Sequence, residues 1–312
     1  MAGISLVLGG NGFLGHYITR ELVYNGEVVR CIERRTPRTE DVLSGVEYII
    51  GDAFDGAFLK SNMRDVSTVY YFISTSMPNS GEKNLGKEIE VTLKSLDNLL
   101  SIMVQLGVRN IVYPSSGGAI YGNQLGQRVS EDVLLKPTTP YGVGKQLSEE
   151  ILKYYSLNYS INANVFRVGN VYGSKQLRDK PQGAVDVFVQ STLKNEPIKI
   201  WGDATKSIRD YIYLEDAAAA IVQTSLLRLS GFNIFNIGTG IGTSIQELIN
   251  IIEKKMDRKV KIEFQPQKTS GVNGIILDCS RIHKTTGWMP KVDIESGIEF
   301  TINAKKRALG LA

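Results

Sequence analysis

Short apolar runs alternate with longer stretches of helical periodicity through the first half of the chain. The short runs are rich in valine and isoleucine, as buried strands are. We expect strands at residues 4–8, 27–32, 46–51, 68–73, 110–113 and 161–167, and helices at 16–24, 85–106 and 140–158. Strands and helices that alternate in this way predict a parallel sheet with right-handed crossovers. The fold class is therefore α/β, with a Rossmann-type doubly wound parallel sheet.

The pattern of polar and apolar residues changes after residue 173. Residues 174–182 are polar, as a loop is, and beyond them we expect a helix at 185–194, a strand at 198–201 and a helix at 244–256. We therefore expect a Rossmann domain over residues 1–169 and a smaller α/β substrate domain over residues 170–312. Residues 205–230 are expected to return and pack on the first domain.

The composition is ordinary for a globular enzyme. The 312 residues are 42% hydrophobic and 22% charged, with a net charge of +4, and a chain of this length buries a large core. No long block of Lys and Arg occurs, which argues against nucleic acid or a membrane surface as a partner. The most apolar later run, 217–227, is too short to cross a bilayer. The first residues lack a basic region, so we expect no signal peptide.

The two cysteines, Cys31 and Cys279, are far apart in sequence and lack the spacing of metal ligands. We therefore expect no disulfide, no metal site and a reducing cytoplasmic environment. His16 and His283 lack neighbours typical of catalysis or metal binding, and we interpret both as structural.

A glycine-rich turn follows the first predicted strand. Gly9 allows a tight turn, Gly12 lets the backbone approach a pyrophosphate, and Gly15 lets the next helix lie close to the sheet. The start of that helix offers N–H groups and a partial positive charge to phosphates. Many strand–helix junctions use glycine, so the turn alone is weak evidence for a dinucleotide. The residues expected to contact one are Gly9, Asn11, Gly12, Phe13, Leu14 and Gly15.

The second predicted strand ends in an acidic residue, Glu33, close to the spacing at which a carboxylate meets the ribose 2′-hydroxyl of NAD. Arg34 and Arg35 follow at once and favour the 2′-phosphate of NADP instead. The repulsion between the Glu33 carboxylate and that phosphate would exceed the attraction from a flexible surface arginine. NAD is therefore the preferred cofactor, and NADP is the alternative. A third interpretation is that Glu33 only ends the strand and has no role in binding a cofactor.

Further cofactor contacts are expected where the next strands end. Asp52 follows residues 46–51 and is a candidate partner for the adenine, with Ala53 beside it. The strand at 68–73 ends in Phe72 and Ile73, followed by Ser74, and these three are expected at the cofactor too.

The candidate chemistry lies at Tyr141 and Lys145, which are four residues apart and share one helix face. A tyrosine hydroxyl is a poor base at neutral pH, but an ammonium within about 5 Å and a positively charged nicotinamide ring favour its phenolate form. The bare spacing is common by chance, and the alternative is a packed tyrosine beside a solvated lysine. The hydroxyl-rich strand end at Ser115 and Ser116, upstream of Tyr141, favours the catalytic interpretation.

Five motifs occur in order along the chain: 9–15 GGNGFLG, 115–122 SSGGAIYG, 141–145 YGVGK, 167–173 RVGNVYG and 209–213 RDYIY. Together they resemble the extended short-chain dehydrogenase/reductases, and within them the NAD-dependent nucleotide-sugar epimerase/dehydratase group, with UDP-glucose 4-epimerases looking most similar. The resemblance covers nearly the whole chain. It implies that Tyr141 and Lys145 are catalytic residues that also contact the cofactor, and it adds Thr92, Ser115 and Gly169 to the expected cofactor contacts.

Two departures from the family pattern and one difference from a related group of enzymes bear on the activity. The family has a Ser or Thr that holds the sugar O4, and its usual place is occupied here by Gly117, so the resemblance makes Ser116 the nearest catalytic hydroxyl. Thr92 stands where the family usually has asparagine. The related 4,6-dehydratases carry Asp-Glu where this chain has Gly118 and Ala119, which argues against water elimination.

For the substrate, the resemblance implies that Asn170 and Arg209 contact a diphosphate, that Trp201 lies against the base, and that Lys268 replaces a second arginine. The same resemblance adds Ser116 and Val185 to the substrate contacts. An arginine suits phosphate and an aromatic ring stacks on a base. The alternatives are an ion pair of Arg209 with Asp210, and core packing of Trp201.

The implied activity is epimerisation at C4 of a UDP-sugar, glucose/galactose or their N-acetyl forms, through a transient 4-keto intermediate with tightly held NAD. The alternatives are a nucleotide-sugar 4-ketoreductase with the same residues, and a non-catalytic nucleotide sensor, which has no need of Tyr141 and Lys145. The resemblance also implies a homodimer in which helices 85–106 and 141–158 pair across a two-fold axis.

Overall fold

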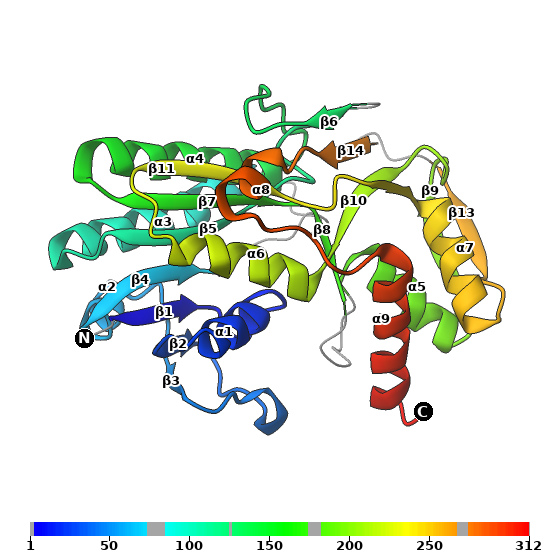
Figure 1. The fold of residues 1–312 in the computed structure, drawn as a ribbon, viewed down its shortest axis with the longest axis horizontal. Coiled ribbons are helices and arrows are strands. Elements are labelled where there is room, and N and C mark those ends of the chain that lie inside the picture. Colours follow the sequence, from blue (N-terminus) through cyan, green and yellow to red (C-terminus); the bar gives the residue numbers. More distant parts are fainter. Residues whose placement is uncertain (1–2, 74–84, 125–126, 174–181, 267–273, 312) are drawn as a thin grey trace.

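The computed structural model describes residues 3–73, 85–124, 127–173, 182–266 and 274–311. A seven-stranded parallel sheet runs through it, in the order β11-β7-β5-β4-β1-β2-β3 (Figure 1). Its strands are β1 (Ile4–Leu8), β2 (Val29–Glu33), β3 (Val46–Ile50), β4 (Val66–Tyr71), β5 (Asn110–Ser116), β7 (Asn162–Val168) and β11 (Phe232–Ile237). The predicted α/β class with a parallel sheet is confirmed. The strand expected at 68–73 ends before Phe72, and the one expected at 110–113 continues to Ser116.

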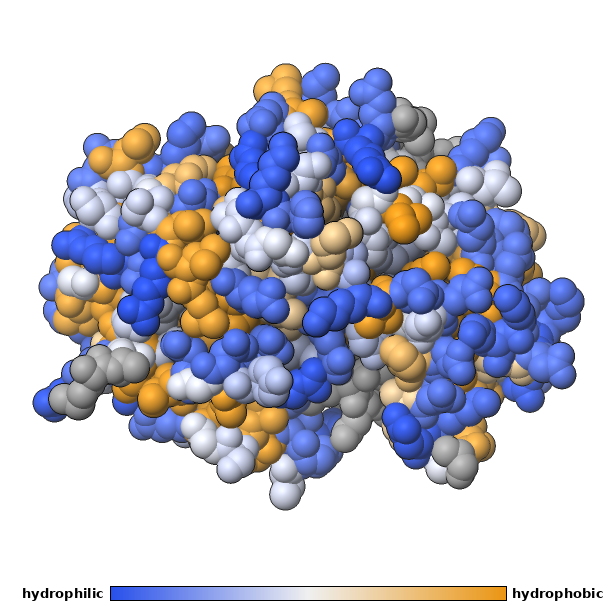
Figure 2. All heavy atoms as spheres, viewed as in Figure 1, coloured by the Kyte–Doolittle hydropathy of each residue, from blue (hydrophilic) through white to orange (hydrophobic). Residues whose placement is uncertain are grey.

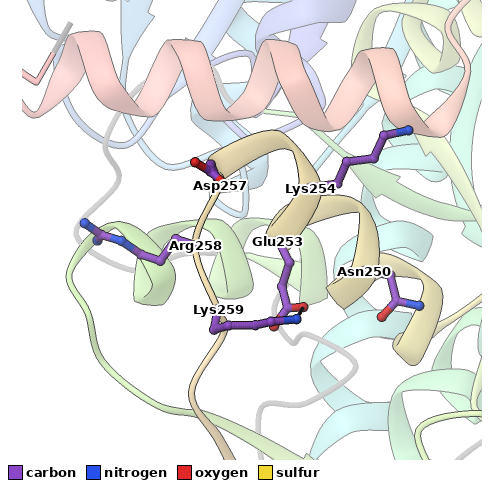
Figure 3. A pocket seen from close by; sticks show the side chains of 6 residues that line it. All are labelled: Asn250, Glu253, Lys254, Asp257, Arg258 and Lys259. Atoms are coloured by element: carbon purple, nitrogen blue, oxygen red, sulfur yellow. Dashed lines mark hydrogen bonds and ion pairs between the residues drawn. The ribbon is translucent and has the colours of Figure 1, made fainter.

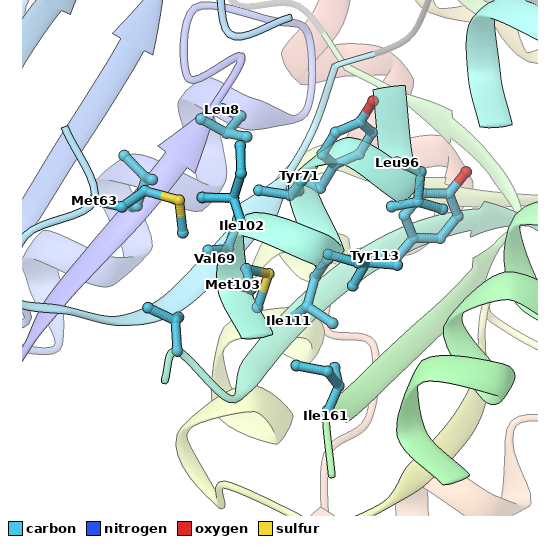
Figure 4. Packing of buried hydrophobic residues seen from close by; sticks show 14 of the residues in the cluster. Leu8, Met63, Val69, Tyr71, Leu96, Ile102, Met103, Ile111, Tyr113 and Ile161 are labelled. Atoms are coloured by element: carbon cyan, nitrogen blue, oxygen red, sulfur yellow. The ribbon is translucent and has the colours of Figure 1, made fainter. Parts of the chain in front are cut away.

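Helices cover both faces of this sheet, which explains why its strands are apolar without alternation. Leu6 and Leu8 of β1 belong to one core, and Val7 between them belongs to the other. The first core lies under α2 (Gly56–Ser61), α3 (Leu85–Leu106) and α4 (Pro140–Tyr159). Figure 4 shows part of it, where Leu96, Ile102 and Met103 of α3 meet the strand residues. The second core lies under α1 (Gly15–Tyr24), α6 (Leu214–Leu226) and α8 (Ser280–Thr286).

The strand order reverses between β1 and β4, because the chain first adds β2 and β3 on one side and then β4, β5, β7 and β11 on the other. In doubly wound sheets, ligands bind outside the carboxyl ends of the strands at this switch point. A ligand site is therefore expected among the residues that follow β1, β2, β4 and β5.

The chain beyond residue 170 contributes to both parts of the molecule. β11 completes the central sheet beside β7, and α6 packs against α1. The other segments, joined by β6 from residues 128–129, build a second region (right and top in Figure 1). It has a smaller sheet in the order β12-β10-β14-β6, in which β8 also pairs with β10, and a two-stranded β13-β9 sheet. The elements of this region are β6 (Arg128–Val129), β8 (Asn170–Tyr172), α5 (Gly183–Leu193), β9 (Ile198–Trp201), β10 (Ile208–Tyr213), β12 (Gly242–Ser244), α7 (Ile245–Met256), β13 (Ile262–Gln265), β14 (Gly274–Leu277) and α9 (Ile294–Ala308). In the first part of the molecule, a short 3-10 helix, η1 (Thr39–Asp41), precedes β3.

The second region has its own apolar core, formed mainly by α5, α7, α9 and the strands beside them. The start of α7 is held by a reciprocal capping box between Ser244 and Glu247. Hydrophilic residues dominate the outer face where α7 and α9 lie (right in Figure 2). None of the helices within the described ranges combines the length and the apolar character of a membrane span.

Candidate functional site

The glycine-rich turn joins β1 to α1 and leaves no room for side chains at Gly9, Gly12 and Gly15. Gly9 has a φ of +87°, and a Cβ there would lie 2.9 Å from the carbonyl oxygen of Phe72. A Cβ on Gly12 would lie 2.9 Å from the Gly9 carbonyl oxygen, and one on Gly15 would overlap that same oxygen. Leu14 stands at the N-cap of α1 and has no side-chain acceptor for the first N–H groups of the helix. The turn therefore presents bare backbone and a helix N-terminus, which is how proteins bind a pyrophosphate.

Glu33 lies against this turn. Its Oε1 accepts a 2.7 Å hydrogen bond from the backbone N–H of Asn11, and its side chain is nearly buried. Arg34 and Arg35, in contrast, are exposed. The carboxylate is thus placed beside the turn by a contact within the fold, and it does more than end a strand.

The neighbouring strand ends lie at the same edge of the sheet. Phe72 donates its N–H to the carbonyl of Leu8, and Phe13 and Ile73 are half-buried. Asp52 is exposed and its carboxylate accepts the N–H of Phe54, while Ala53 is buried. Ser74 and Lys268 lie outside the described residues.

Tyr141 and Lys145 lie on the first turns of α4, which begins with Pro140 and is capped by the Thr139 side chain. The Nζ of Lys145 is 5.8 Å from the centre of the Tyr141 ring. The same Nζ donates a 2.7 Å hydrogen bond to the carbonyl of Pro114 and a 3.3 Å bond to the hydroxyl of Tyr113. Lys145 is therefore a buried ammonium held on β5, beside the half-buried Tyr141, and not a solvated surface lysine.

Ser115, Ser116 and Gly117, at the end of β5, lie in three different environments. Ser115 is buried and its Oγ donates a 2.5 Å hydrogen bond to Oε1 of Glu149. A Cβ at Gly117 would lie 2.7 Å from Cδ1 of Leu277 and 3.0 Å from the carbonyl oxygen of Arg167. Ser116 lies between them and is half-buried. The structure thus explains why position 117 is a glycine.

The next glycine makes room for a polar side chain. A Cβ at Gly118 would lie 2.9 Å from Oδ1 of Asn170. The amide of Asn170, at the start of β8, is therefore in contact with the turn that follows Ser116. Gly169, just before it, would place a Cβ 2.9 Å from the carbonyl oxygen of Asp210.

Thr92 lies on α3, facing α4. Its hydroxyl donates a 3.3 Å hydrogen bond to Oε1 of the buried Glu88. A Cβ at Gly144 would lie 3.3 Å from that same oxygen, so α3 and α4 approach closely at this level. Thr92 therefore lies one helical turn from the Glu88–Gly144 contact between the two helices.

Arg209 and Asp210 of β10 have separate partners. Asp210 is buried, and it accepts hydrogen bonds from the N–H groups of Thr239, Gly240 and Leu277 and from the Thr239 hydroxyl. Burial raises the pKa of this carboxyl above its ordinary value, although these hydrogen bonds oppose the shift. Arg209 donates to the carbonyl of Ile208, and burial lowers its pKa. Because successive strand residues point to opposite faces, an Arg209–Asp210 ion pair does not account for these side chains.

The other predicted substrate contacts differ in exposure. Trp201 is 45% exposed at the end of β9, so core packing does not explain it. Val185 is 1% exposed and belongs to the core of the second region. Trp201 therefore has surface to offer a ligand, whereas Val185 has almost none.

Sequence reasoning assigned no role to a buried polar network behind Ser115. Both oxygens of Glu149 accept hydrogen bonds from Arg167, the shortest being 2.6 Å, and Arg167 also donates to the Tyr121 hydroxyl and the Glu131 carbonyl. Burial alone would lower the pKa of Arg167, but its contacts with Glu149 raise that pKa above its ordinary value. A spacing of one helical turn after Lys145 was the only sequence signal for Glu149.

A polar pocket also lies at the end of α7 (Figure 3). It is lined by Asn250, Glu253, Lys254, Asp257, Arg258 and Lys259. Glu253 accepts hydrogen bonds from Lys259 and from the N–H of Val260, and we assign the pocket no catalytic role. Within the described residues, no group of three or more His, Cys, Asp or Glu side chains is arranged to hold a metal ion.

Comparison with known proteins agrees with this geometry. The sequence profile of the NAD dependent epimerase/dehydratase family matches residues 5–238. A putative UDP-glucose 4-epimerase of Methanocaldococcus jannaschii is 31% identical over 304 residues, covering 96% of this chain and 98% of that protein. A dTDP-4-dehydro-6-deoxyglucose reductase of Escherichia coli is 30% identical over 318 residues, covering 96% of each. The structure of the Thermus thermophilus UDP-glucose 4-epimerase in complex with NAD superposes with a TM-score of 0.87, at 29% identity over 96% of this chain and 98% of that one.

Proposed function

Since the chain belongs to the NAD-dependent epimerase/dehydratase family, we propose that it epimerises a UDP-hexose at C4 through a transient 4-keto intermediate. The observation that carries the proposal is the cluster at the end of β5, where Tyr141 lies beside the anchored Lys145 and Ser116 follows the buried Ser115. NAD is the cofactor that this family uses.

The residues around the glycine-rich turn fit NAD. Gly9, Gly12 and Gly15 lie so close to neighbouring backbone that no side chain can stand there, and the N-terminus of α1 faces the phosphates in such a turn. We assign Asn11, Phe13, Leu14, Asp52, Ala53, Phe72, Ile73, Thr92, Ser115 and Gly169 to the same binding region. Glu33 would accept from the ribose hydroxyls, while the exposed Arg34 lies at its rim. NAD, when bound, supplies the capacity to accept and return a hydride.

Each catalytic residue has a distinct role in the proposal. Tyr141, as phenolate, takes the proton of the C4 hydroxyl and later returns it. Lys145 stabilises that phenolate, and its bond to the Pro114 carbonyl fixes it in position. Ser116 donates a hydrogen bond to the sugar O4, because Ser115 is engaged by Glu149 and position 117 has no side chain.

The substrate would be held by residues that follow residue 169. Asn170 and Arg209 bind the diphosphate, with Lys268 as a further candidate, and Trp201 stacks on the base. We leave Val185 out of this site because it is buried in the second core. The 4-keto sugar then turns about its diphosphate, so that C4 is reduced on the opposite face. In this proposal residues 1–169, on which α6 of the returning segment 205–230 packs, hold NAD, while Arg209 of that segment and the rest of 170–312 hold the nucleotide sugar.

The alternative is a nucleotide-sugar 4-ketoreductase. The similarity to the Escherichia coli reductase favours it, since the same Tyr141 and Lys145 serve both reactions. Incubation of the purified protein with UDP-glucose, without added cofactor, separates the two. An epimerase forms UDP-galactose with no net change in NADH, whereas a reductase forms none and consumes NADH or NADPH only when given a 4-keto sugar.

A further inference from the structure

The catalytic helix is fastened to the end of β5 at two successive turns. Lys145 bonds the carbonyl of Pro114, and Glu149, four residues later, accepts from the hydroxyl of Ser115. Tyr141, Lys145 and Glu149 share one face of α4 because they are four residues apart. Two neighbouring β5 residues are therefore held by two neighbouring helical turns.

Arg167 holds the other side of Glu149. It lies on β7, paired in register with Ser115, and its guanidinium donates to both carboxylate oxygens. Both side chains are almost fully buried, at 4% and 3% exposure. A buried ion pair of this kind adds little to stability compared with apolar residues of the same size, so its presence calls for another explanation.

Arg167 also contacts the far end of the segment from Ser115 to Tyr121, which we call the Ser116 segment. Its Nη1 donates a 3.0 Å hydrogen bond to the hydroxyl of Tyr121, which in turn donates to Oδ1 of Asn236 at 2.6 Å. Tyr121 is fully buried. The Glu149–Arg167 pair therefore holds Ser115 at one end and Tyr121 at the other, and Ser116 with its two following glycines lies between these points.

We propose that Glu149 and Arg167 are positioning residues, which set where the Ser116 hydroxyl lies relative to Tyr141. This inference rests on the proposed epimerase activity. Neither residue touches reacting atoms. A glycine pair after Ser116 gives the segment little stiffness of its own. The two side-chain anchors therefore add to the backbone bonds that hold it, which run from the N–H of Gly117 to the carbonyl of Val168 and from the N–H of Ile120 to the carbonyl of Ser116.

The test replaces the pair with apolar side chains of similar length. We expect Glu149→Met/Arg167→Met to fold and retain NAD, because an apolar pair substitutes for a buried ion pair. We expect kcat to fall about 10- to 100-fold, the scale of a misplaced catalytic group, with KM for the UDP-hexose within about twofold. A double variant with the kcat of the wild type would overturn the inference.

The matched control is Leu152→Ala on the same helix, a fully buried residue of the first core. It lowers Tm without releasing the Ser116 segment, so kcat should stay near the wild-type value. An equal fall of kcat in this control would mean that the pair acts through stability alone. If the Met double variant does not fold, Ser115→Ala/Tyr121→Phe releases both ends while the ion pair remains, and the same loss of kcat is expected. An unchanged kcat in that variant would also overturn the inference.

Failure of the proposed function is recognised separately. If the wild-type protein epimerises no UDP-hexose, the proposed reaction is wrong, and the inference is then decided by the crystal structure of the folded double variant. A displaced Ser116 relative to Tyr141 supports the positioning role, and an unmoved Ser116 overturns it.

Discussion

Leu277 occupies the space in which a side chain at Gly117 would lie: a Cβ there would be 2.7 Å from the Cδ1 of Leu277. Leu277 is fully buried on β14, and its N–H is held by the carboxylate of Asp210. Gly117 does not have a positive φ, so the glycine is required by this contact and by the Arg167 carbonyl, not by its backbone conformation.

We predict that Gly117→Ser destabilises the protein by about 1–3 kcal/mol, the range for overpacking a core. Leu277→Ala alone costs about 2–5 kcal/mol, but the double variant should lose less than the sum, since the smaller side chain relieves the overlap. Urea unfolding of the four proteins gives this coupling. Additive losses would mean that the two residues do not compete for space.

Tyr141→Phe tests the proposed base. We predict that it lowers kcat by at least about 10²-fold, the scale of a lost general acid–base, with NAD binding nearly intact. Tyr154→Phe is the matched control on the same helix, because Tyr154 is 53% exposed. Retention of most activity by the Tyr141 variant would refute the assignment.

The two serines should differ in their effects. We predict that Ser116→Ala lowers kcat strongly, whereas Ser115→Ala causes a smaller loss because Ser115 donates to Glu149 and not to the sugar. Steady-state kinetics of both variants decide the matter. Equal, small losses would show that no side-chain hydroxyl is needed at the sugar O4.

Glu33 is expected to select NAD. We predict that Glu33→Ala weakens NAD binding by roughly 10- to 100-fold, the worth of a hydrogen bond to a charged group, and narrows the difference between NAD and NADP. Calorimetric Kd values for both cofactors provide the measurement, with the exposed Glu196→Ala as control. Tighter binding of NADP by the wild type would reverse the preference and favour the reductase.

The protein is expected to form a homodimer through α3 and α4. Of the apolar residues on these two helices, Leu96, Leu100 and Tyr155 pack within the chain's own core, but Tyr154 and Leu157 of α4 remain exposed. Light scattering should give a molar mass of twice the 34.4 kDa of one chain. Leu157→Glu should shift that mass toward the monomer, and Leu134→Glu, at another exposed leucine, should not. A monomeric wild type would rule out the dimer.

Local sequence was sufficient for the features that depend on nearby residues. The alternation of apolar runs and helical periods determined the parallel α/β sheet, because each strand and helix buries a pattern that can be counted along the chain. The spacing of Gly9, Gly12 and Gly15 determined the strand–turn–helix shape, and the four-residue spacing of Tyr141 and Lys145 put them on one helix face.

Tertiary structure alone decided the features that join distant segments. No local pattern shows that Ser115 donates to Glu149, that Leu277 excludes a side chain at position 117, or that β11 completes the sheet beside β7. Trp201 could be an exposed or a core residue until β9 was placed at the edge of the second region. These contacts depend on which surfaces meet when the chain packs. They are set by pairs of segments that are far apart in sequence, so no single segment reveals them.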